Sequence, residues 1–276
     1  KAHRKKPGLV VLFGSGELTS VGRSIREEVF TRAGLTAPVV MGILETPTGF
    51  EVNAIHGWPE RQQEFFEKHL ANYHPKVTRI RAWRKDGQRS TNDPAVVDAL
   101  LTQDYIYSGA GSPTYVIRHL RGTRAWRNIV KAHKQGAVLC FGSATAVAVG
   151  AYAIPVYEIF KAGADLSWAR GLNFFKTYGL RIAVVPHWNN QEGEDFDSTR
   201  CWMGVDRFDA LQRLLPQGIT VLGIEETTAV VFDFTLLTMS VLGTGNVHIL
   251  RGKDERTLKS GETHPVSVLK YASAFR

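Results

Sequence analysis

Hydrophobic and polar positions alternate along the first half of the chain in a pattern that predicts a parallel sheet with crossover helices. Short runs of β-branched and aromatic residues have the length of buried strands. Segments between them have helical length and one polar face. The predicted strands are 10–13, 39–44, 77–80, 105–107 and 138–141, and the predicted helices are 24–33, 60–71, 94–101 and 124–134. Since helices would lie on both faces of such a sheet, we expect its strands to be buried on both sides.

The pattern changes after Gly142. Residues 143–153 are mostly small and predict a helix packed closely against the sheet, and a strand over 181–185 follows. Further short strands, some of them antiparallel, are predicted at 220–224, 229–232, 239–242 and 247–250. The sequence has no internal repeat and no linker rich in Pro or Ser. We therefore predict one α/β domain over residues 1–276, with a mostly parallel doubly wound sheet, helices on both faces and C-terminal antiparallel strands.

The composition agrees with a soluble globular protein, because 276 residues of which 43% are hydrophobic can bury a large core. No window resembles a membrane span, and the basic start at residues 1–6 leads into a strand pattern instead of the apolar region of a signal peptide. Cys140 and Cys201 are too few for a disulfide framework or a thiolate metal site. We expect a cytoplasmic protein with reduced thiols.

The net charge of +8 raises the possibility of a nucleic-acid partner. The densest basic stretch contains an aromatic side chain that could stack on a base: Arg79, Arg81, Trp83, Arg84, Lys85 and Arg89. The stretch falls at the end of a predicted strand and in a polar loop, which favours a solvated connection. RNA or DNA binding is kept as a minor hypothesis.

A possible nucleophile follows the last strand of the first half. Gly142 and Ser143 stand between that strand and the run of small residues, which is the arrangement of a nucleophile elbow. The usual elbow is G-x-S-x-G, whereas Phe141 and Thr145 occupy the flanking positions here. Ser143 is the candidate nucleophile, and a serine that only caps a buried helix is the alternative.

A second glycine loop follows the preceding strand. Residues 108–113 contain Gly109, Ala110 and Gly111, whose amides could point to the same crevice at the carboxyl ends of the strands. With Ala144, this loop is the predicted oxyanion hole. A phosphate cradle is the rival interpretation, although the loop lacks the Lys-Ser or Lys-Thr ending of a P-loop.

His187 is the candidate general base, because it follows the predicted strand 181–185 at the expected active edge of the sheet. A histidine base needs an acid to fix its tautomer. Glu226, after an apolar strand, and Glu158, after the elbow helix, are both candidates, and for either the alternative is a structural carboxylate. The other histidines, such as His69, His74 and His133, are assigned to the surface, with no metal site. Cys140 should lie inside its strand as a buried structural thiol.

Taken in order, five short motifs resemble the dipeptidase E and cyanophycinase family of serine peptidases, a variant of the class I glutamine amidotransferase fold. The motifs are Phe13-Gly14-Ser15-Gly16-Glu17, Gly109-Ala110-Gly111, residues 136–146, Pro186-His187-Trp188, and residues 223–229. The resemblance covers roughly Gly8 to Arg251. It implies that Ser143 is the nucleophile and His187 the base. The cyanophycinase-like pattern implies Glu226 as the acid and the dipeptidase E-like pattern implies Glu158; we prefer Glu226, because its Gly-Ile-acid-Glu context is retained.

The leading hypothesis is therefore a serine hydrolase, a peptidase or amidase that cleaves a small peptide or another amide without a metal or organic cofactor. The altered elbow motivates a second hypothesis, a catalytically inactive ligand-binding or interaction protein of the same fold. The turn after His187 contains Asn189 and Glu192 where the family has arginines, so neither family substrate is carried over. A homodimer is expected only because homodimers are common.

Overall fold

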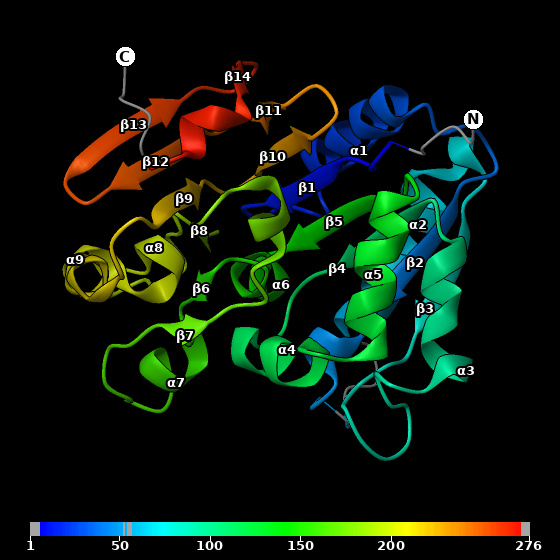
Figure 1. The fold of residues 1–276 in the computed structure, drawn as a ribbon, viewed down its shortest axis with the longest axis horizontal. Coiled ribbons are helices and arrows are strands. Elements are labelled where there is room, and N and C mark those ends of the chain that lie inside the picture. The colour runs from blue at the N-terminus through cyan, green and yellow to red at the C-terminus, as the bar shows by residue number, and fades with distance from the viewer. Residues whose placement is uncertain (1–5, 52, 54–56, 272–276) are drawn as a thin grey trace.

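Two β-sheets organise the chain, as the computed structural model in Figure 1 shows. The structure describes residues 6–51, 53 and 57–271. Residues 1–5 of the basic start and residues 272–276 of the predicted domain lie outside the described residues. So do residue 52 and residues 54–56.

The first sheet has eight strands, in the order β14-β11-β10-β1-β5-β4-β2-β3. Its parallel part consists of β1 (Val10–Phe13), β5 (Val138–Gly142), β4 (Tyr105–Ser108), β2 (Val40–Leu44) and β3 (Lys76–Ile80). On the other side of β1 lie the antiparallel strands β10 (Thr228–Asp233), β11 (Thr238–Gly243) and β14 (Thr263–Pro265). In the parallel part, β1 and β5 are in register so that Phe13 lies opposite Gly142.

The second sheet has six strands, in the order β13-β12-β9-β8-β6-β7. Its strands are β13 (Asp254–Leu258), β12 (Val247–Arg251), β9 (Thr220–Ile224), β8 (Ile182–Val185), β6 (Tyr152–Ala153) and β7 (Ala169–Arg170). Strands β6, β8 and β9 are parallel and the outer strands antiparallel. The predicted α/β class, with parallel strands first and antiparallel strands near the C-terminus, is confirmed. The sequence pattern does not show that the strands divide between two sheets.

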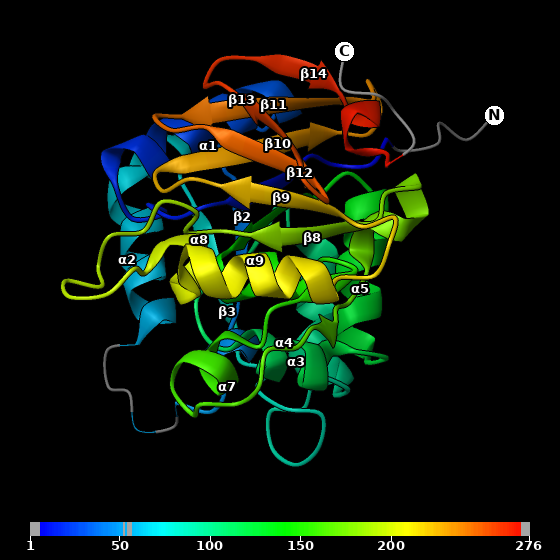
Figure 2. The same cartoon turned by 90° about the vertical axis from the view of Figure 1, so that its left-hand side faces the viewer.

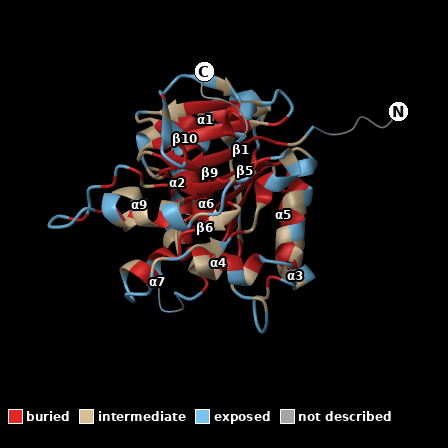
Figure 3. Ribbon diagram, turned by 60° about the vertical axis from the view of Figure 1, so that its left-hand side comes forward, coloured by how far each residue is buried: buried red, intermediate tan, exposed pale blue. Residues whose placement is uncertain are grey.

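Helices cover both faces of the first sheet. Side chains of α1 (Ser20–Ala33) and α2 (Trp58–His69) pack with Val11 and Phe13 on one face. Val10 and Leu12 point to the other face, where the helices α3 (Pro94–Val97), α4 (Pro113–Leu120) and α5 (Arg124–Lys134) pack. This alternation is the period of two expected of a strand that is buried on both sides. Figure 3 shows the result as a buried centre of strands inside an exposed rim.

Helix α6 (Ser143–Ala148) lies between the two sheets and contacts β5, β6 and β8. In Figure 2, α9 (Gly204–Leu214) runs in nearly the same direction as β8 of the second sheet. The other helical elements are short: α7 (Val156–Phe160), α8 (Thr199–Trp202), η1 (Thr46–Thr48), η2 (Ala71–Tyr73), η3 (Asp98–Thr102), η4 (Phe174–Tyr178) and η5 (Val266–Leu269). None of the helices in the described ranges has the length and apolar character needed to cross a bilayer.

Two predicted helices differ from the structure. The helix predicted over 143–153 is wrong in length, because it ends at Ala148 and the chain becomes strand β6. The amide of Ala151 donates to the carbonyl of Ile182 at 2.7 Å, so pairing with β8 replaces the helical hydrogen bonds. The segment predicted as a helix over 94–101 is α-helical only to Val97 and continues as the 3-10 helix η3.

Candidate active site

Ser143 occupies the sharp turn between β5 and α6. Its backbone is left-handed, with φ of 43°, an uncommon conformation for a residue with a side chain. Thr145, which stands where the elbow pattern has glycine, is fully buried, and its hydroxyl donates to the carbonyl of Gly109 at 3.1 Å. The hydroxyl also lies 3.0 Å from Ser108 Oγ. The threonine thus links α6 to the end of β4 through hydrogen bonds. The sharp strand-to-helix turn is present despite the altered motif.

His187 lies directly beyond β8 and faces Ser143. Its Nε2 is 3.1 Å from Ser143 Oγ, and its Nδ1 is 3.3 Å from Glu226 Oε1. The backbone of His187 is left-handed, with φ of 53°, and its amide donates to the carbonyl of Gly14 at 3.0 Å. The ring therefore lies between a hydroxyl and a carboxylate, each within reach of one ring nitrogen.

Glu226 follows β9 and is oriented by two asparagines. Its carboxylate accepts a hydrogen bond of 2.9 Å from Asn190 Nδ2, and its amide donates to Asn189 Oδ1 at 2.8 Å. The hydrogen bond to His187, followed by that from Asn190, lowers the pKa of Glu226 below its ordinary value. The carboxylate is consequently ionised at neutral pH and can accept the Nδ1 proton of His187.

Glu158 lies elsewhere. It belongs to α7, and its Oε1 accepts a hydrogen bond of 2.5 Å from the hydroxyl of Thr114. Within the part of the chain that the structure describes, Glu158 has no hydrogen bond to His187, and it lines a different cavity, with Ser112 and Tyr115. Of the two predicted acids, the structure brings Glu226 to His187 and leaves Glu158 apart from it.

A cavity of about 610 Å³ contains Ser143, His187 and Glu226. The predicted oxyanion residues Ala110, Gly111 and Ala144 also line it. Among the described residues, the amides of these three donate to no protein acceptor. Residues that line the cavity with Ser143 therefore have backbone donors that no protein acceptor uses.

Trp202 is a residue of this site that sequence reasoning missed. Its ring centroid lies 4.8 Å from that of His187. Three consecutive residues, Arg200 to Trp202, have left-handed backbone, and the amide of Cys201 donates to the carbonyl of His187 at 3.2 Å. Arg200 lies over the ring of Trp188 at 3.9 Å. No local pattern predicts this arrangement, because the strained segment is held by contacts to the turn after β8.

Cys140 and the histidines outside the site differ in their burial. Cys140 is fully buried, as predicted, and burial raises the pKa of its thiol to about 11. His69 and His74 are exposed, but the assignment of His133 to the surface is wrong, because only 1% of it is exposed. Within the described ranges, no group of three or more His, Cys, Asp or Glu side chains could hold a metal ion.

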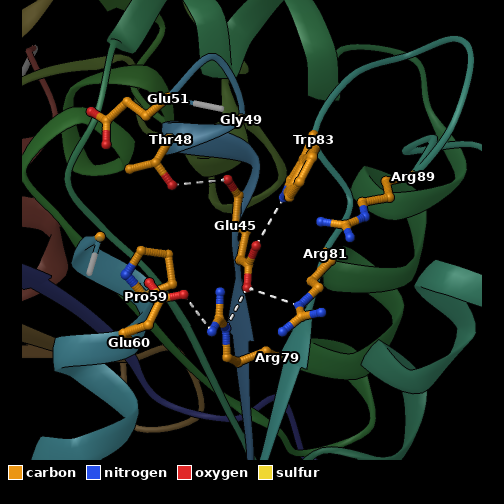
Figure 4. Close-up of a pocket in the computed structure, with 11 residues that line it drawn as sticks. Glu45, Thr48, Gly49, Glu51, Pro59, Glu60, Arg79, Arg81, Trp83 and Arg89 are labelled. Atoms are coloured by element: carbon orange, nitrogen blue, oxygen red, sulfur yellow. Dashed lines mark hydrogen bonds and ion pairs between the residues drawn. The ribbon is translucent and has the colours of Figure 1, made fainter. Parts of the chain in front are cut away.

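The basic stretch forms part of a separate, polar pocket of about 220 Å³ beside β2 and β3 (Figure 4). Arg79 pairs with Glu45 at 2.5 Å and with Glu60 at 2.6 Å. Arg89 lies over the ring of Trp83 at 3.8 Å, and the Trp83 indole donates to Glu45 at 2.8 Å. Two of the basic side chains on which the nucleic-acid hypothesis depends are therefore already paired, Arg79 with carboxylates and Arg89 with an aromatic ring.

No protein-family model matches the sequence, and neither does any curated protein. Solved structures do match. A peptidase from an acI-B1 Actinobacterium superposes with a TM-score of 0.74 and 22% identity, over 95% of this chain and 98% of the other. A Listeria monocytogenes EGD-e protein with a provisional assignment as Peptidase E superposes with a TM-score of 0.51 and 16% identity, over 92% of this chain and 98% of the other. At these identities the likeness establishes the fold, and the resemblance drawn from the motifs is confirmed at that level.

Proposed function

We propose that this chain is a serine hydrolase, a peptidase or amidase, in which Ser143, His187 and Glu226 form the catalytic triad. The observation that carries the proposal is the position of the His187 ring, with one nitrogen 3.1 Å from Ser143 Oγ and the other 3.3 Å from Glu226 Oε1. These separations are close to those expected of a nucleophile, a base and an orienting acid before substrate binds.

In the proposed reaction, Ser143 Oγ attacks the carbonyl carbon of an amide while His187 Nε2 takes the hydroxyl proton. The same nitrogen then gives that proton to the leaving amine. Glu226 accepts the Nδ1–H of His187, which keeps Nε2 free to act as the base. The free amides of Gly111 and Ala144, with Ala110 beside them, would stabilise the oxyanion. Water, activated by His187, hydrolyses the resulting ester, and no metal or organic cofactor is required by these steps.

The left-handed backbone of Ser143 supports catalysis over the alternative of an inactive binding protein. A serine that only caps a helix has no need of a strained turn. Here the strain at φ of 43° coincides with a histidine in hydrogen-bond reach of the hydroxyl. Strained backbone at a cavity wall is a common feature of reactive side chains.

A fluorophosphonate probe tests the proposal, because labelling requires an activated nucleophile. We expect one adduct per chain on the wild-type protein, located at Ser143 by peptide mass mapping, and none on Ser143→Ala. Ser112→Ala is the matched control, since Ser112 is a serine of the neighbouring loop that is engaged with Thr114. A folded wild-type protein that remains unlabelled would favour the inactive alternative.

We also infer a single domain over residues 1–276, a cytoplasmic location and a peptide or other amide as substrate. The buried, unpaired state of Cys140 and Cys201 supports a reducing compartment. Peptidases among the structures of the same fold support a peptide substrate. Homodimer formation remains a proposal that sedimentation would test.

A further inference from the structure

A buried carboxylate lies beside the proposed nucleophile. Glu17 follows the glycine-containing loop after β1; only 3% of it is exposed, and it lines the same cavity as Ser143. A Cβ atom on Gly142 would lie 1.9 Å from Glu17 Oε1. Glycine is therefore required before Ser143, because the carboxylate occupies the space of a side chain there. This contact places the Glu17 carboxylate against the backbone that carries the nucleophile.

The Glu17 carboxylate has little compensation for its burial. In the described part of the chain, its one hydrogen bond is a long one of 3.5 Å from the Tyr107 hydroxyl. No Lys, Arg or His among those residues forms an ion pair with it. The nearby guanidinium of Arg26 donates to the backbone carbonyl of Glu17, at 2.6 Å, instead of to the side chain. Since a buried charge is costly without a partner, the site is suited to a ligand that brings a cation.

Part of the cavity wall is apolar, and the cavity carries few positive charges. Its wall includes the side chains of Trp58, Val147, Val156, Tyr157, Phe160 and Trp202. Lys161 is the one Lys or Arg among the described residues that line it, and its ammonium lies 4.7 Å from the centre of the Phe160 ring. Glu17, Glu192 and Glu226 all line the cavity. An acidic side chain would meet more carboxylates than cations here, whereas an apolar one would be well accommodated.

We propose that Glu17 binds the free α-ammonium group of a peptide substrate and that the apolar wall accepts the side chain of the same N-terminal residue. In such a residue one Cα separates the ammonium nitrogen from the carbonyl carbon that Ser143 would attack. A carboxylate next to the nucleophile is therefore in the right place to bind that ammonium. The proposal deepens the proposed function and rests on it: the enzyme would release apolar N-terminal residues, and Glu17 would determine specificity.

Matched substrates test this proposal. We would measure kcat/KM for phenylalanyl and aspartyl p-nitroanilides, each with a free and with an acetylated amino group. We expect kcat/KM for the free phenylalanyl compound to be about 10- to 100-fold higher than for its acetylated form, the size expected of a charge-assisted hydrogen bond. It should also be higher than kcat/KM for the free aspartyl compound. Glu17→Gln should bring the free-to-acetylated ratio close to one, and Glu17→Asp should restore part of it. Glu64→Gln, the same charge change at an exposed position of α2, should retain the wild-type ratio.

Binding to the Ser143→Ala variant separates this inference from the proposed function. Calorimetry would compare phenylalanyl-phenylalanine with its acetylated form on Ser143→Ala and on Ser143→Ala with Glu17→Gln. Suppose that the free amine binds more tightly in a manner that depends on Glu17, but the probe does not label the wild-type protein. This result would refute the hydrolase and retain Glu17 as an ammonium site. Labelling of Ser143 with a ratio near one, or a faster aspartyl substrate, would refute this inference alone.

Discussion

Single residues with unusual backbone conformations form the proposed reactive centre. Ser143, His187 and Thr227 are left-handed, with φ of 43°, 53° and 53°. Each such residue costs about 1–2 kcal/mol, so other contacts must hold them in place. The amide of Thr227 donates to Ser15 Oγ at 3.2 Å and that of His187 to the carbonyl of Gly14 at 3.0 Å. The loop after β1 thus supports the backbone at the proposed base and next to the proposed acid.

The choice between the two predicted acids can be tested at this scale. Glu226→Gln replaces the acceptor of the Nδ1 proton with an amide that can favour the wrong tautomer of His187. We expect kcat to fall by about 10²- to 10⁴-fold, as in other triads that lose their acid. Glu158→Gln alters a carboxylate that is bonded to Thr114 and should change kcat by less than about threefold. Steady-state kinetics on one amide substrate give kcat for both variants. Equal decreases in kcat would contradict the assignment of Glu226.

At the scale of elements, α5 buries a histidine that the sequence pattern assigned to the surface. His133 lies in its last turn, where a basic residue is favourable to the helix and is usually solvated. In the structure the ring of His133 packs edge-on against Phe174 and Tyr178 of η4 and against Phe234. Burial, with Lys134 adding to it, lowers the pKa of His133 to about 4. The aromatic cluster that covers this face comes from segments distant in sequence.

This burial predicts a loss of stability in acid. The pKa of His133 falls from 6.5 to about 4 on folding, so the unfolded chain binds the proton more readily. The contribution of the neutral ring is complete above pH 6.5 and is lost as the pH falls towards 4. We expect His133→Phe to reduce the fall in the free energy of unfolding between about pH 7.5 and about pH 5 by about 2 kcal/mol. Urea unfolding of the wild-type protein and of His133→Phe at each pH measures this difference. An equal decrease in the free energy of unfolding for the two proteins would argue against a buried neutral His133.

On the scale of the whole molecule, the proposed triad joins the two sheets. Ser143 follows β5 of the first sheet, whereas His187 and Glu226 follow β8 and β9 of the second. Gly14 lies where they meet, and a Cβ at this position would be 2.0 Å from the carbonyl oxygen of Glu225. One buried hydrophobic cluster contains residues of both sheets, among them Leu12 and Leu222. The geometry of the site therefore depends on how the sheets pack together.

This shared core predicts that the chain unfolds as one unit. We expect a single urea transition, with the same midpoint for far-ultraviolet circular dichroism, tryptophan fluorescence and probe labelling of Ser143. Tryptophans near each sheet, such as Trp126 and Trp188, make fluorescence sensitive to both. Labelling that is lost at a lower urea concentration than the other two signals would show that the second sheet separates first, and would contradict the single domain.

The sequence by itself determined the strands and most helices of the first half, because hydrophobic periodicity reports which side of each element is buried. It also determined the residues at the carboxyl ends of β5, β8 and β9, where parallel strands place a crevice. Only the tertiary structure shows which of Glu226 and Glu158 lies beside His187, since both follow apolar segments and their distance to His187 depends on the packing of the second sheet. The same holds for Glu17, Trp202 and His133. Their surroundings come from residues remote in the chain, and local pattern carries no information about such contacts.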